Sequence, residues 1–160
     1  MRKRFNDHHD AWSTAVYYVL TLTNGDQDNA LNQDVLNEYI EIFDEIERDS
    51  HNACLVIQSD HPKTFCNGLD LAWLMQQSMQ DKKAFTLQLE NMLLRLALLN
   101  LPVIAEINGN AYAGGAILAS ACDFRLMRAD KGRFCFPEVK LTIPFTDCIA
   151  EIVQLIPNQH

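Results

Sequence analysis

The sequence has no long apolar run and is short of positive charge. None of its stretches approaches the roughly 18 uninterrupted apolar residues that a membrane-spanning helix needs. The 160 residues carry 13 Lys and Arg against 21 Asp and Glu, a net charge of −8. A protein that binds nucleic acid by neutralising phosphates needs an excess of cations instead. We therefore expect neither insertion into a membrane nor binding to nucleic acid.

Paired cysteines and grouped histidines are also missing. The five Cys include no C-x-x-C pair, and the five His are scattered. This pattern argues against a zinc site or a thioredoxin-like motif, and we expect no metal. The basic start of the chain is followed by polar residues, where a secretion signal would need an apolar run. Unpaired thiols without a signal predict a cytoplasmic protein.

The rest of the composition is that of a globular domain, with 48% hydrophobic and 21% charged residues. A chain of this length can bury one sizeable core. Residue types and periodicity predict strands at 14–23, 53–58, 103–107, 124–127 and 133–136. Helices are predicted at 32–48, 69–77, 82–100 and 116–121, with another starting near 149. This alternation predicts an α/β fold.

A glycine pair, Gly114-Gly115, stands between a predicted strand and a predicted helix. With Gly109 it imitates the spacing of a phosphate-binding P-loop. Gly115 and Ala116 occupy the positions of the required Lys and Ser/Thr, which excludes that function. At a helix start the pair can present free N–H groups to an oxygen that carries negative charge. The alternative, which we favour for a glycine pair alone, is tight packing of the helix on a strand.

Two other segments could carry chemistry. Asn67-Gly68 is a second turn before a helix, so it could present another free N–H or be an ordinary β–α turn. Beside it, Cys66 could be a nucleophile with His61 as its base, although such a pair is too weak a signal to support a mechanism. Glu138 follows Pro137 among apolar neighbours, which would suit a general base. The alternative for Glu138 is a solvated loop charge.

Taken together, these segments resemble the enoyl-CoA hydratase/isomerase (crotonase) superfamily. The likeness spans residues 14–147 and is nearest to the Δ3-Δ2 enoyl-CoA isomerases, including the plant type. The segments that carry it, in order, are Asn29-Ala30-Leu31-Asn32, Phe65-Cys66-Asn67-Gly68-Leu69-Asp70-Leu71, Pro102-Val103-Ile104-Ala105-Glu106-Ile107-Asn108-Gly109, Ala113-Gly114-Gly115, Cys122-Asp123 and Pro137-Glu138.

The resemblance implies a spiral of β-β-α units over residues 14–160, after an N-terminal extension of residues 1–13. The resemblance also leads us to expect that the sequence lacks the C-terminal helical region of the longer family chains. The substrate implied is an acyl-CoA thioester of fatty acid metabolism, with no separate cofactor. The family also implies a homotrimer or hexamer, which we expect to be weakened, together with CoA affinity, without the C-terminal helices.

The resemblance also assigns the site. Backbone N–H groups of Asn67 and Gly114 would form an oxyanion hole for the thioester oxygen. The residues implied in substrate binding are Ala30, Asn67, Gly68, Leu69, Asp70, Gly114 and Ile117.

Catalysis departs from the hydratase pattern of two glutamates. Ile117 occupies the first glutamate position, and Glu138 occupies the second. Hydration needs two acid–base groups, whereas one base can move a proton from carbon 2 to carbon 4. We therefore predict an isomerase that shifts a 3-enoyl-CoA double bond to position 2. The alternatives are a hydratase or another crotonase-type reaction that uses Glu106, which we expect to point outward, or a non-catalytic acyl-CoA-binding module.

Overall fold

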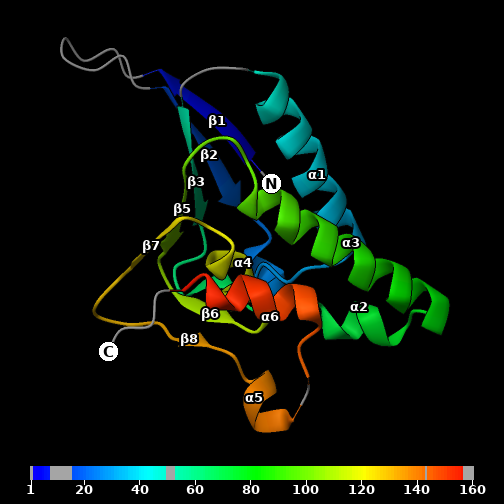
Figure 1. Ribbon diagram of the computed structural model, residues 1–160. Helices are drawn as coiled ribbons and strands as arrows, with labels where there is room; N and C mark the ends of the chain where they lie inside the picture. Colours follow the sequence, from blue (N-terminus) through cyan, green and yellow to red (C-terminus); the bar gives the residue numbers. More distant parts are fainter. Residues whose placement is uncertain (1, 8–15, 50–52, 143, 157–160) are drawn as a thin grey trace.

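The computed structural model describes residues 2–7, 16–49, 53–142 and 144–156, whose strands form two sheets (Figure 1). The larger sheet has the order β1-β2-β3-β5-β7, and the smaller one β4-β6-β8. All neighbouring strands are parallel except β1, which pairs antiparallel with β2. The strands are β1 (Arg2–Asp7), β2 (Val16–Leu22), β3 (Ala53–Ser59), β4 (Thr64–Cys66), β5 (Val103–Ile107), β6 (Asn110–Tyr112), β7 (Phe124–Met127) and β8 (Phe134–Cys135).

Helices follow the strands in a repeating order. A strand of the large sheet is followed by a strand of the small sheet and then by helix, as in β3-β4-α2, β5-β6-α4 and β7-β8-α5. The helices are η1 (Gly25–Gln27), α1 (Gln33–Arg48), α2 (Leu71–Met75), α3 (Met79–Ala97), α4 (Gly114–Ser120), α5 (Glu138–Leu141) and α6 (Asp147–Gln154). The predicted α/β spiral of β-β-α units is confirmed.

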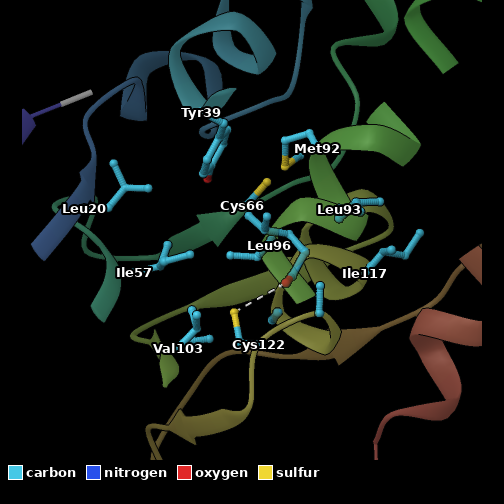
Figure 2. Packing of buried hydrophobic residues seen from close by; sticks show 14 of the residues in the cluster. Leu20, Tyr39, Ile57, Cys66, Met92, Leu93, Leu96, Val103, Ile117 and Cys122 are labelled. Carbon is cyan, nitrogen blue, oxygen red and sulfur yellow. Dashed lines mark hydrogen bonds between the residues drawn. The ribbon is translucent and has the colours of Figure 1, made fainter. Parts of the chain in front are cut away.

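The core lies between the large sheet and the helices that cover it (Figure 2). Asn32 caps α1 as the sequence predicts, since its side chain accepts a hydrogen bond from the N–H of Val35 at 3.1 Å. The helix then buries one stripe at helical spacing, formed by Leu36, Tyr39, Phe43 and Ile46. Helix α3 buries Phe85, Leu89, Met92, Leu93 and Leu96 against the same core. These two helices hold the strands whose ends form the candidate site.

The sequence analysis did not predict several of the short elements as separate strands or helices. Strands β4 and β6 have three residues each, and α5 has four, so periodicity has too few positions to reveal them. Strand β1 was not expected because it falls in the predicted extension, where charged residues dominate. The boundary predicted between residues 13 and 14 lies outside the described residues. Within the described part of the chain, no helix combines the length and apolar character required to cross a membrane.

Gly115 brings α4 directly onto β4. A Cβ built on Gly115 would lie 2.0 Å from the carbonyl oxygen of Cys66, well inside contact distance. The obstructing atom belongs to the backbone and cannot rotate away. The packing interpretation of the glycine pair is therefore confirmed for Gly115.

We expect Gly115→Ala to lower the free energy of unfolding by about 1–3 kcal/mol, because the two backbones must separate. Gly25→Ala is the control: its Cβ would meet only side-chain atoms of His61, at 3.0–3.2 Å, so a shift of a few tenths of an ångström relieves the contact. Chemical denaturation of both variants and the wild type checks the prediction. Equal stability of Gly115→Ala and Gly25→Ala would contradict this close backbone contact.

Candidate active site

Two turns meet where the small sheet ends. Strands β4 and β6 are parallel neighbours, so the turn after each lies at the same edge. The first turn runs through Asn67 and Gly68 into α2, which Asp70 caps by accepting the N–H of Trp73 at 2.9 Å. A Cβ on Gly68 would lie 3.0 Å from the nitrogen of Gly114, at the start of α4. The Ala113 Cβ lies as close, at 2.9 Å, so a side chain on Gly68 would not fit between the two turns.

The Asn67 N–H is not free, which corrects the predicted oxyanion hole. It donates to the carbonyl oxygen of Asp28 at 3.0 Å, so it has no hydrogen left for a substrate. The resemblance assigned the first donor to Asn67, and in the structure that N–H already has an acceptor. Gly68 adopts a φ of 89° and reverses the chain, so N–H groups on its two sides face different partners.

The next N–H after the glycine, that of Leu69, is the free one. Leu31 bridges this turn by donating to the Gly68 oxygen at 2.7 Å and accepting from the Asp70 N–H at 2.9 Å. In a parallel β-bridge, one residue makes both hydrogen bonds to the residues before and after its partner. Leu31 therefore bonds to Gly68 and Asp70, and the N–H of its partner Leu69 points away from it. Among the described residues no acceptor faces it.

Gly114 keeps its predicted free N–H. It is the first residue of α4, and N–H groups in a first turn have no acceptor within the helix. No other acceptor for this N–H occurs in the described ranges. Ala113, which precedes it, has a φ of 49° and a ψ of −123°, a conformation that favours glycine. The chain thus holds a strained residue at the point that orients the Gly114 N–H.

Glu138 is brought to the same edge by β8. This strand lies beside β6, and the N–H of Ala113 donates to the carbonyl oxygen of Cys135 at 3.0 Å. Three residues later, Glu138 begins α5. Its side chain is half-buried, and its Oε2 is fully buried with no hydrogen-bond partner among the described residues. A buried carboxyl oxygen without a partner is costly, and a ligand that donates a hydrogen or a proton would remove that cost.

Aromatic rings support the segment that carries Glu138. The Phe136 ring meets that of Phe134 edge-to-face, with centroids 5.5 Å apart. It meets the ring of Phe145, beyond α5, in the same way at 6.1 Å. Such pairs fix ring orientation in addition to burying apolar area. They hold the chain before and after Glu138 together.

The other two positions considered for a second acid–base group are Ile117 and Glu106, and they differ in burial. Ile117, three residues after Gly114 in α4, is only 4% exposed and packs in the core cluster (Figure 2). Glu106 is exposed on β5, whose inward positions Val103, Ala105 and Ile107 are buried. The expectation that Glu106 points outward is confirmed. Neither position adds a second carboxylate on the core side.

Cys66 is unsuited to act as a nucleophile. Its side chain is fully buried, and burial raises the pKa of the thiol to about 12, although the Gly68 N–H acts in the opposite direction. The reactive thiolate would therefore be scarce near neutral pH. No group of three or more His, Cys, Asp or Glu in the described part of the chain could hold a metal ion.

Ala30 lies beside this edge, next to the bridging residue Leu31. It lines a cavity of about 220 Å³ between the end of β2 and the start of α1. The cavity wall includes the carboxylates of Asp34 and Glu38 and has no Lys or Arg. Phosphate groups of a CoA would be repelled there, so they need partners elsewhere. Leu31, next to Ala30, bridges to Leu69, and Gly68 lies against Gly114, so these expected binding residues belong to neighbouring segments.

Comparison with known proteins fits this geometry. The sequence profile described as enoyl-CoA hydratase/isomerase matches residues 13–154. The short-chain-enoyl-CoA hydratase of Clostridium acetobutylicum is 34% identical over 78% of this chain and 48% of its own length. The peroxisomal enoyl-CoA delta isomerase 2 of Arabidopsis thaliana is 31% identical over 86% of this chain and 59% of its own.

Solved structures agree with the sequence matches. The crystal structure of enoyl-CoA hydratase from Bacillus anthracis superposes with a TM-score of 0.75 at 26% identity, over 89% of this chain and 53% of that one. This chain therefore spans about half the length of the relatives that it matches. The profile covers most of this sequence, and the fold agrees with it. The chain belongs to the enoyl-CoA hydratase/isomerase family.

Proposed function

We propose that this chain binds an acyl-CoA thioester and moves a 3-enoyl double bond to position 2. In this proposal Glu138 carries the proton, and the N–H groups of Leu69 and Gly114 bind the thioester oxygen. The observation that carries the proposal is the buried, unpartnered Oε2 of Glu138, three residues after β8, in a chain whose neighbouring strands β4 and β6 lead to two free N–H groups. Each of these three groups lacks the partner that a substrate would supply.

The proton balance needs only one carboxylate. Glu138 removes a proton from carbon 2, and the electron pair of that C–H bond spreads over the double bond and the thioester carbonyl. The resulting dienolate takes the proton back at carbon 4, which leaves the double bond between carbons 2 and 3. A positioned base of this kind contributes about 10²–10⁴-fold to a rate.

The two N–H groups stabilise the negative charge that develops in the transition state. Negative charge develops on the thioester oxygen only as the dienolate forms, so donors aimed at that oxygen stabilise the transition state more than the substrate. Loss of one such donor commonly costs about 2.7–4 kcal/mol. Both donors belong to the backbone, and Leu31 and the strained Ala113 hold them in place.

In this proposal the substrate binds at the same edge of the small sheet. The CoA moiety would run along Ala30 and the Asn67–Asp70 turn, and its phosphates would need cations such as Lys63, Lys82 and Lys83. Acyl-chain specificity would involve Ile117, which lies one helical turn beyond Gly114. The cytoplasmic location and the trimeric or hexameric state stay predictions.

Hydration is the second candidate, because a short-chain-enoyl-CoA hydratase is among the relatives. It requires a second acid–base group, and Ile117 is apolar and buried while Glu106 is exposed on the outward side of β5. A non-catalytic acyl-CoA-binding module would not need the buried carboxylate oxygen of Glu138. Both alternatives are weaker for these reasons.

We expect Glu138→Gln to slow conversion of a 3-enoyl-CoA to the 2-enoyl-CoA by at least about 10²-fold, because the amide cannot take a proton. Glu106→Gln, which alters an exposed carboxylate outside the site, should keep the wild-type rate. A spectrophotometric isomerase assay compares the variants, and titration with acetoacetyl-CoA checks that binding persists. Equal rates for wild type and Glu138→Gln would contradict the assignment.

Ile117→Glu tests whether the absence of a second carboxylate is what prevents hydration. With a second carboxylate near Gly114, we expect hydration of crotonyl-CoA to rise above the wild-type rate. Ile117→Gln is the matched control, because it introduces similar volume and polarity without an acid. Circular dichroism must show that both variants fold, since a buried polar group is destabilising. Rapid hydration by the wild type would instead favour the second candidate.

A further inference from the structure

Helix α3 has a second apolar face that covers nothing in the described part of the chain. Its exposed leucines are Leu87 and Leu94, and Leu98 at its C-terminal cap continues the same face; they are 67%, 44% and 78% exposed. With exposed Ala84 and Asn91 they follow a spacing of three and four residues. This is the heptad spacing of a helix–helix seam, with a single Asn among apolar positions. We call these five residues the α3 seam.

The α3 seam points away from the core. At 3.6 residues per turn, its residues lie on roughly the opposite side of the helix from Phe85, Leu89 and Met92, which are buried. Figure 1 shows α3 at the surface, and it contacts both α1 and α6. Contiguous exposed apolar residues of this kind mark interaction sites in soluble proteins. The seam can therefore meet a partner helix without disturbing the fold.

Both sides of the seam are acidic. On the α1 side, Arg95 is shared between Asp44 and Glu47, with both nitrogen–oxygen distances at 2.8 Å, so negative charge remains in excess. Helix α1 as a whole has six acidic residues and a single Arg. On the α6 side, Asp147 and Glu151 are exposed, and that helix has no Lys or Arg.

Glu90 adds to the acidic side near α6. Burial and then the carboxylate of Glu90 raise the pKa of Cys148 in α6, which places Glu90 toward that helix. The exception is the first turn of α3, where Lys82 and Lys83 precede Ala84. Acidic surroundings thus accompany the part of the seam from Leu87 to Leu98.

We propose that the α3 seam binds a basic amphipathic helix, with apolar residues at heptad spacing and Lys or Arg on both sides of them. Apolar residues of the partner would pack between the three leucines, and its cations would face the acidic residues of α1 and α6. A polar residue opposite Asn91 would fix the register. A second copy fits poorly, because each copy has a net charge of −8 and would bring the same acidic sides together.

The test uses a labelled peptide of three heptads, with Leu in the seam, one Asn, and Lys at the flanking positions. Fluorescence anisotropy with the full chain should show saturable binding that weakens as salt rises. The triple variant Leu87→Gln, Leu94→Gln, Leu98→Gln should weaken binding at least tenfold. Leu126→Gln with Leu155→Gln, which changes exposed leucines outside α3, should leave it unchanged. Circular dichroism should give the same helix content for all proteins.

Three results would overturn the proposal. One is equal affinity of the wild type and the triple variant for the Lys-flanked peptide. Another is equal binding of a peptide in which Glu replaces every flanking Lys, since charge selects the partner in this account. The third is sedimentation equilibrium that shows self-association of the wild type and a monomeric triple variant, because a second copy would then occupy the seam.

Discussion

The close approach of two backbones determines the rest of this site. Helix α4 begins against the chain that leaves β4, because Gly68 and Gly114 meet there and Gly115 lies on the Cys66 carbonyl. A Cβ at Gly115 would separate these segments. Their contact places the free N–H groups of Leu69 and Gly114 at one edge of the small sheet, where β8 also delivers Glu138.

This edge of the small sheet contains groups that lower the stability of the folded protein. Two N–H groups have no acceptor among the described residues, a carboxyl oxygen is buried without a donor, and Ala113 has a backbone conformation that favours glycine. Strain and unsatisfied polar atoms of this kind concentrate at functional sites, because a ligand can relieve them. The well-packed helices α1 and α3 and the large sheet provide the stability that offsets these costs.

The long elements and several site residues could be predicted because their signals are local. The apolar stripe of α1, the Asn32 cap, the glycine pair and the outward-facing Glu106 can all be inferred from residue type and spacing. The identity of the first N–H donor could not, because it depends on which nitrogen the Asp28 carbonyl occupies, and Asp28 is distant in the sequence from Asn67. The short strands β4 and β6, which create the shared edge, are also set by pairing between distant segments.

The central claim concerns two backbone N–H groups, and proton–nitrogen correlation spectra of the labelled protein test it most directly. On addition of acetoacetyl-CoA, the amide protons of Leu69 and Gly114 should move downfield, because each gains a hydrogen bond to the thioester oxygen. The amide of Asn67, which already donates to Asp28, should shift much less. A large shift at Asn67 together with an unchanged Leu69 would contradict this account.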